Sequence, residues 1–356
     1  MKNFENKQMK SEHTTSNALK INYTPQSSTI VFFLALFLPS IVVTIFNVIV
    51  GDIYQNSLTY YIALTLMQLT FVAIYIAYNK IGKYNPKKAS KLNFNLNYKQ
   101  ILIIIVIGII GLFSFSPLVN LYQGILQIFG HTASFDNLNL SDVGYLFLNI
   151  LIVGLFPAVC EELIFRGVIL NGCSKYKKWV MVVVSSLLFM IMHLSIDQTI
   201  YQLFLGVLLS LVVITTGSIV SSMILHAVNN FVILFTNYLY NIMGVDTNVP
   251  YEFTVWNCIY PILIAIAGVI ICVLLVKLLG KVTKNKVSAK NEIIDTKSQL
   301  ENKESKNEKL ANSNNKNEQI ANSYILKGLT QSSSELFWLL LGVGGGIIYW
   351  VIMIII

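Results

Sequence analysis

Apolar segments long enough to cross a lipid bilayer recur along this sequence, and they restrict its fold more than any other feature. A membrane-spanning helix needs about 20 predominantly apolar residues. Only 12% of the residues are charged, whereas a soluble domain carries about 25%. We therefore predict an all-α membrane protein with nine spans, near residues 29–50, 58–79, 101–123, 144–171, 179–196, 199–216, 218–239, 254–277 and 336–356.

Lysine placement predicts how these spans are oriented. Cytoplasmic loops of membrane proteins collect Lys and Arg. In this chain the lysines outside the spans fall in alternate segments, and the intervening loops near 51–57, 124–143, 197–198 and 240–253 contain no Lys or Arg. We therefore expect a multi-pass protein of the cell membrane with a cytoplasmic N-terminus. The net charge of +8 is spread over these loops, so we expect no nucleic-acid partner.

Composition divides the chain into four parts. These are a cytoplasmic tail at 1–28, a transmembrane core at 29–280, a linker at 281–332 and a C-terminal transmembrane helix at 333–356. The linker is rich in Lys, Asn, Glu and Ser, and such a segment buries too little apolar surface to fold compactly. We predict that it is cytoplasmic and disordered, or partly helical.

The C-terminal helix carries Gly342 and Gly346 at a spacing that lets two membrane helices approach closely. The same spacing also arises by chance in a glycine-rich apolar helix. If the glycines form a contact face, another membrane protein is an expected partner through this helix.

Ionisable side chains inside the spans are few, and they are the candidates for chemistry. Arg166 is the only arginine of the chain, Glu161 and Glu162 are the acidic residues well inside a span, and His193 and His226 are the two intramembrane histidines. Each such group costs a few kcal/mol to place in a bilayer, about 2.5–3.5 on insertion scales, and is functional by default. We therefore expect these side chains to meet one another.

Helical spacing predicts how they meet. Glu162 and Arg166 are four residues apart and share a helix face, as do His226 and Asn230. Three helices then present polar stripes to a common cavity. There Glu161 and a histidine hold and deprotonate a water, while Asn230 and the second histidine stabilise the oxyanion formed at a peptide carbonyl.

Three motifs give these residues a family context. The sequence reads EExxxR at 161–166, FxxxH at 189–193 and HxxxN at 226–230. In this order, over roughly residues 140–240, it resembles the CPBP family of CAAX prenyl endopeptidases and bacteriocin-processing enzymes (Abi-type). The resemblance implies an eight-helix bundle of the CAAX-protease type, here with one extra C-terminal helix. It also implies a polar intramembrane site reached from the cytoplasmic side.

The resemblance also assigns roles. Glu161 is the expected catalytic base, His193 its partner on the water, and His226 and Asn230 the oxyanion-stabilising pair, while Glu162 and Arg166 are structural. Zinc is one alternative, because Glu161, His193 and His226 supply three ligands and leave an open position. Activation of water without a tightly bound metal is the other, and we favour it.

Two functions follow from these observations. The first is an intramembrane endopeptidase. Because Lys and Ile far outnumber Arg, as in an AT-rich bacterial genome, its substrate is expected to be a peptide or membrane-protein precursor rather than a prenylated tail. The second is a non-proteolytic membrane scaffold or regulator, acting in bacteriocin immunity or as the partner of a cell-envelope enzyme or sensor protein. It is suggested by the long linker and the ninth span.

Overall fold

A computed structural model describes residues 19–53, 56–131, 138–246, 249–305 and 333–355, and of the side chains in α11 it describes those up to Ser288. Within these ranges the chain is helical, without a β-strand, and eight helical segments are long and apolar enough to cross a membrane. This confirms the predicted all-α membrane bundle. The eight segments are α2 (Pro25–Val50), α3 (Ser57–Ile81), α5 (Tyr98–Ile128), a composite segment (Val143–Leu170), α9 (Thr199–Thr216), α10 (Val220–Met243), α11 (Val255–Ser305) and α13 (Ser333–Ile355).

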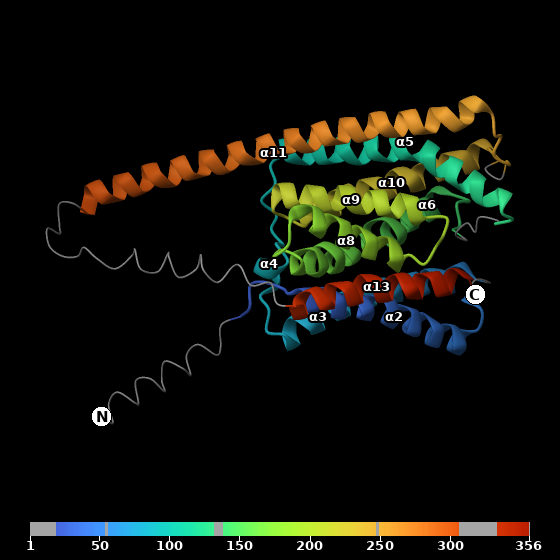
Figure 1. Cartoon of the computed structure of the whole chain (residues 1–356), viewed down its shortest axis with the longest axis horizontal. Helices are drawn as coiled ribbons and strands as arrows, with labels where there is room; N and C mark the ends of the chain where they lie inside the picture. The colour runs from blue at the N-terminus through green and yellow to red at the C-terminus, as the bar shows by residue number, and fades with distance from the viewer. Residues whose placement is uncertain (1–18, 54–55, 132–137, 247–248, 306–332, 356) are drawn as a thin grey trace, which may run out of the picture.

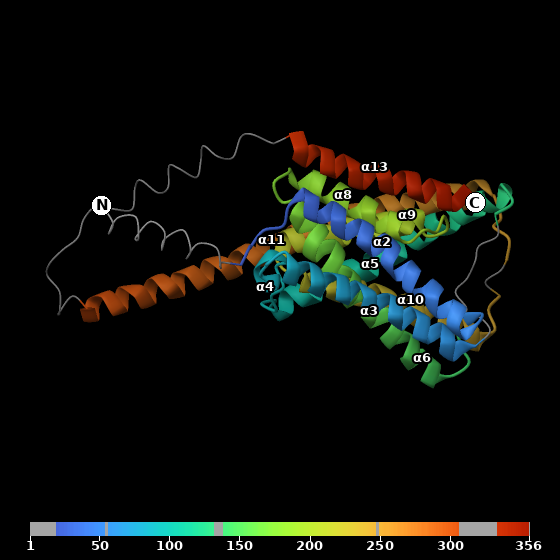
Figure 2. The same ribbon diagram turned by 90° about the horizontal axis from the view of Figure 1, so that it is seen from below.

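The helices run along a common axis in three groups (Figure 1). Helices α5 and α11 pack along each other on one side, and α2, α3 and α13 lie on the other. Between them lie α9, α10 and the shorter apolar helix α8 (Lys178–Met192). Figure 2, seen from below, shows α2 and α3 side by side, with α13 next to α8.

The composite segment changes helix type three times. It contains α6 (Val143–Asn149), the π-helix η3 (Ile150–Leu155), α7 (Phe156–Glu162) and the π-helix η4 (Leu163–Leu170). A π-helix bonds each N–H one residue further back than an α-helix and occurs often at functional sites. The carboxylates of Glu161 and Glu162 therefore lie at the junction between α7 and a wider turn.

Helix α8 is shorter than the span predicted at 179–196. It ends at Met192, His193 follows as its C-cap, and Leu194 adopts a left-handed conformation with φ of 47°. A left-handed residue costs about 1–2 kcal/mol and ends a right-handed helix. The sequence prediction of the end of this span was thus wrong, and His193 lies at the end of a helix rather than inside one.

The lysine-bearing segments meet at one end of the bundle, which we call the lysine-rich end. The backbone of Lys20 pairs with that of Lys83 and Asn85, and Lys91 O accepts from Ile219 N at 3.2 Å. Further contacts join Lys286 to Asn95 and Lys175 to Glu335. The same end carries α4 (Pro86–Ala89), visible at the left of the bundle in Figure 1.

The lysine-free loops meet at the opposite end, the lysine-poor end. His131 Nε2 lies 2.9 Å from Asp197 Oδ1, and Tyr122 donates to Ile196 O at 2.9 Å. Asn241 donates to Leu140 O at 2.9 Å. The two sets of loops therefore separate in space as their lysine content predicts.

Of the two forms expected for the linker, the part that the structure describes is helical. Helix α11 continues without a break through Ser305, so the first part of 281–332 is helical. Residues 306–332 lie outside the described residues, as do residues 1–18 of the predicted N-terminal tail.

Helix α13 packs its glycine face on α2. A Cβ at Gly342 would lie 2.9 Å from Thr29 Oγ1, and one at Gly346 would lie 2.9 Å from the Phe32 ring. Thr29 Oγ1 also donates to Trp338 O at 2.5 Å. The small-residue spacing thus brings two helices of the same chain together.

Candidate active site

An ion pair without any solvent exposure anchors the site. Arg166 Nη1 donates to Glu162 Oε1 at 2.8 Å, and both side chains are fully buried. Arg166 Nη2 donates to Gly206 O at 3.1 Å. A Cβ at position 206 would lie 2.9 Å from Ser186 Cα, so glycine there allows α8 and α9 to approach closely enough for this bond. Burying this charge is favourable only with such compensation.

Phe189 connects this ion pair to both histidines. Its ring lies 4.4 Å from the Arg166 guanidinium carbon, and it meets the rings of His193 and His226 edge-on at centroid distances of 4.8 and 5.9 Å. Its carbonyl oxygen lies 2.8 Å from His193 Nδ1. The FxxxH motif therefore does more than pack, because Phe189 orients His193 through both its ring and its backbone.

Both histidines are fixed through Nδ1. A carbonyl oxygen only accepts, so His193 must carry its proton on Nδ1 in order to bond Phe189 O. His226 Nδ1 lies 3.1 Å from Glu162 Oε1, and a carboxylate imposes the same tautomer. In each neutral ring Nε2 then has a free lone pair, and both rings line the cavity described below.

Glu161 differs from Glu162 in its surroundings. Its side chain is 5% exposed, and Oε1 accepts from Gln68 Nε2 at 3.3 Å. Among the described residues its buried Oε2 has no hydrogen-bond partner, as is also true of Glu162 Oε2, but Glu161 lines the cavity described below and Glu162 does not. A buried acceptor without a partner costs about 1–3 kcal/mol. Such a cost is expected where an oxygen must stay available for a ligand or a reacting water.

Asn230 compensates for a proline. Pro157 has no N–H, so it cannot bond to the carbonyl of Val153, four residues earlier. Asn230 Nδ2 lies 3.4 Å from Val153 O and 3.3 Å from Gly154 O. Its oxygen accepts from Asn229 Nδ2 at 3.3 Å, and Asn229 in turn bonds to Tyr201. Asn230 thus supports the junction of η3 and α7 at Pro157 as well as lining the cavity.

A polar cavity of about 560 Å³ brings the predicted residues together. Glu161, His193, His226 and Asn230 all line it, and they come from the composite segment, from the end of α8 and from α10. Glu162 and Arg166 lie behind this surface and contact it through His226 and Phe189. The structure therefore brings the three motifs together, as their helical spacing predicts.

The side chains as they lie do not fit a zinc site. Glu161, His193 and His226 are of the right chemical type. Across the described ranges, however, no group of three or more His, Cys, Asp and Glu side chains is placed to hold a metal ion. We therefore derive the chemistry below from the protein's own groups.

Sequence reasoning missed several uncharged residues of the site. Gln68, Tyr201 and Asn229 line the cavity and bond to one another or to predicted residues. Intramembrane polar side chains mark functional positions less clearly than charges do, because their cost in the bilayer is smaller. The available signal was Gln68 itself, an amide in the middle of the apolar segment 57–81.

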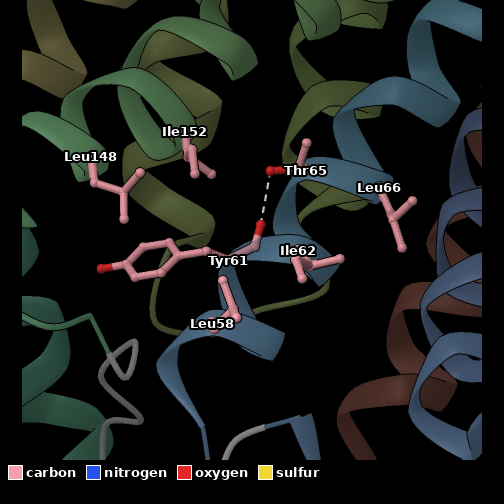
Figure 3. A pocket seen from close by; sticks show the side chains of 7 residues that line it. All are labelled: Leu58, Tyr61, Ile62, Thr65, Leu66, Leu148 and Ile152. Carbon is pink, nitrogen blue, oxygen red and sulfur yellow. Dashed lines mark hydrogen bonds between the residues drawn. The ribbon is translucent and has the colours of Figure 1, made fainter. Parts of the chain in front are cut away.

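A separate groove of about 230 Å³ lies between α3 and the start of the composite segment (Figure 3). It is lined by Leu58, Ile62, Leu66 and other mainly apolar side chains, and the one hydrogen bond drawn there is from Thr65 to Tyr61 O. Ile152 belongs to both this groove and the polar cavity. The groove offers apolar surface without groups for acid–base chemistry.

Comparison with known proteins gives one match. Residues 143–232 match the model of a family described as type II CAAX prenyl endopeptidase, Rce1-like. This segment contains all six predicted site residues and runs from α6 into α10. No curated protein and no solved structure matches the chain.

Proposed function

Because residues 143–232 match the model of the Rce1-like type II CAAX prenyl endopeptidase family, we propose that this chain is an intramembrane endopeptidase of the CPBP type that cleaves a membrane-associated peptide or protein precursor. The observation that carries the proposal is the partnerless Oε2 of Glu161 in a cavity shared with His193 and His226. A carboxylate and two imidazoles with free Nε2 atoms are the groups needed to activate a water.

The proposed reaction begins with a water between Glu161 and Nε2 of His193. Glu161 takes one proton as the water oxygen bonds to the peptide carbonyl carbon, and the carbonyl oxygen becomes an oxyanion. The proton then passes from Glu161 to the peptide nitrogen, and the C–N bond breaks. General base catalysis of this kind contributes about 10²–10⁴-fold.

His226 is proposed to stabilise the oxyanion. The carboxylate of Glu162 holds the ring through Nδ1, and a proton taken up at the free Nε2 during the reaction would let this nitrogen donate to the developing negative charge. Arg166 and Gly206 hold that carboxylate in place. Asn230 Nδ2, which lies 3.4 Å from Val153 O and 3.3 Å from Gly154 O, is proposed as the second donor to the same oxyanion.

The substrate and location follow from the sequence. The lysine-rich end is proposed to face the cytoplasm of a bacterial cell, with the protein in the cell membrane. The proposed substrate is a peptide precursor or small membrane protein rather than a prenylated tail.

The test is to replace Glu161 with Gln and compare the peptides released from membranes that contain either form, by mass spectrometry. Loss of specific fragments in Glu161→Gln is expected. The exposed Glu252→Gln is the matched control and should release the wild-type set. The scaffold or regulator function would instead be supported by two results together. The wild type and both variants would release identical fragments, and a Glu161→Gln, His193→Ala double variant would restore the phenotype of cells that lack the protein.

A further inference from the structure

The two ends of the polar cavity differ in solvent exposure. Its floor is formed by buried groups, with Glu161 5% and His226 3% exposed. At its other end the cavity is lined by Asn120, Gln198 and Asn237. These residues are exposed and lie in or next to the parts of α5, α9 and α10 nearest the lysine-poor end. These exposed lining residues therefore lie toward the loops that contain no lysine, and the reacting groups lie at the buried end.

The opposite direction is closed by packed side chains. Beyond the floor, toward the lysine-rich end, lie Arg166 and the apolar side chains of Phe165, Val168 and Ile169, all 0% exposed. No residue of the loops 82–97 and 171–177 lines the cavity in the part of the chain that the structure describes. Water and substrate therefore have their path from the lysine-poor end, which differs from the cytoplasmic access implied by the family resemblance.

The cavity wall has a distinct chemistry. Among the described lining residues there is no lysine or arginine, and the acidic side chains are Glu161 and Asp197, the latter paired with His131. Carboxamides dominate the polar part, and eight of them line the cavity: Gln68, Asn120, Gln123, Gln198, Gln202, Asn229, Asn230 and Asn237.

Carboxamides indicate a particular class of ligand. Each one offers both N–H donors and a carbonyl acceptor without a charge. An extended peptide presents the same two groups at every residue and leaves them unpaired unless its surroundings supply partners. A lipid chain needs neither. The wall thus suits the backbone of an extended, uncharged peptide segment.

We propose that this cavity is a substrate vestibule, open at the lysine-poor end, that takes an extended uncharged peptide segment and presents it to Glu161 from the side opposite the lysine-rich loops. The substrate class rests on the endopeptidase function proposed above. The side of access does not, because it follows from the lining residues and their exposure alone.

The side of access is tested by cysteine labelling in sealed membrane vesicles of known orientation. The parent carries Cys258→Ala, because the other three cysteines are buried. Asn120→Cys and Gln202→Cys probe the vestibule at two depths. Ser141→Cys and Ser174→Cys, both at exposed positions, report the lysine-poor and lysine-rich ends. The probe is a small membrane-impermeant methanethiosulfonate.

Modification of both vestibule cysteines from the side that modifies Ser141→Cys is expected. Modification from the side that modifies Ser174→Cys, or from neither side, would overturn the proposal. A Glu161→Gln background should give the same pattern, so this result stands whether or not the chain is a protease.

The substrate class is tested with two glutamines of α5. Gln123 lines the vestibule, whereas Gln127, one turn further on, does not. With a peptide identified from the membrane comparison, Gln123→Ala should raise KM about tenfold at similar kcat, the cost of one or two hydrogen bonds. Gln127→Ala should keep the wild-type KM. Equal values for the two variants would contradict peptide binding along this wall, and absence of any cleaved peptide would refute the protease function while leaving the labelling result intact.

Discussion

Glu162 holds His226 through the same carboxylate oxygen that binds Arg166. Oε1 lies 2.8 Å from Arg166 Nη1 and 3.1 Å from His226 Nδ1. The neighbouring carboxylate of Glu161 has no such cation; each glutamate keeps its Oε2 without a hydrogen-bond partner, but of the two only Glu161 lines the polar cavity. Two adjacent glutamates thus serve different purposes, one in the structure and one in the chemistry.

This difference predicts opposite effects of the same substitution. Glu162→Gln leaves the Arg166 charge buried and uncompensated, which should cost about 3–5 kcal/mol of stability. Glu161→Gln keeps the bond to Gln68 and removes a poorly satisfied buried oxygen, so its stability should stay within about 1 kcal/mol of wild type. Thermal unfolding of the detergent-solubilised protein measures both. Similar losses for the two variants would contradict the assignment.

The contact of Asn230 with Val153 O, the carbonyl that Pro157 leaves without its N–H, predicts coupling between Asn230 and Pro157. Asn230→Ala should cost about 1 kcal/mol, because two carbonyls lose their donor. In a Pro157→Ala background residue 157 regains an N–H for Val153 O, so the same substitution should cost less. A double-mutant cycle in stability measures the difference.

The cycle also separates the two roles of Asn230. If catalysis needs its amide, the double variant Pro157→Ala, Asn230→Ala should remain impaired in cleavage although its stability recovers. Recovery of both cleavage and stability would assign Asn230 a structural role at the η3–α7 junction alone.

The glycine face of α13 gives a third prediction. Gly346→Leu would collide with Phe32 and should destabilise the packing of α13 on α2 by about 1–3 kcal/mol. Gly344, in the same helix, has no atom within 4 Å of a built Cβ. Gly344→Leu should therefore stay within about 0.5 kcal/mol. The melting temperatures of the two solubilised variants test this directly, and equal shifts would argue against a specific α2–α13 contact.

Metal removal gives a fourth prediction. Because the described His, Cys, Asp and Glu side chains do not form a three-ligand group, cleavage should survive dialysis against a strong zinc chelator such as 1,10-phenanthroline. Activity that is lost on dialysis and restored by zinc would show that the ligands rearrange to bind the metal.

The sequence predicted most of the bundle and the centre of the site. Long apolar segments leave few alternatives to spanning helices in a bilayer. The meeting of Glu161, Glu162 and Arg166 with the two histidines followed from the free-energy cost of placing ionisable side chains in lipid. The grouping of lysine-bearing loops at one end followed from their alternation along the chain.

Other features depend on geometry that periodicity does not encode. The π-helices η3 and η4 keep the hydrophobicity of an ordinary span, so they are invisible in the sequence. The end of α8 depends on the left-handed conformation of Leu194. Glycine usually marks such a position in a sequence, and this position is a leucine. The places of Tyr201 and Asn229 in the site depend on their spatial neighbours, which the sequence does not give.

The early end of α8 has a further consequence. Its 15 residues rise about 22 Å, against about 30 Å for the hydrocarbon layer of a typical bilayer. Short hydrophobic segments are accommodated by local thinning of the surrounding lipid. The bilayer beside the exposed face of α8 should therefore be thinner than elsewhere around the bundle, and proteins reconstituted in lipids of shorter acyl chain should be the more stable ones.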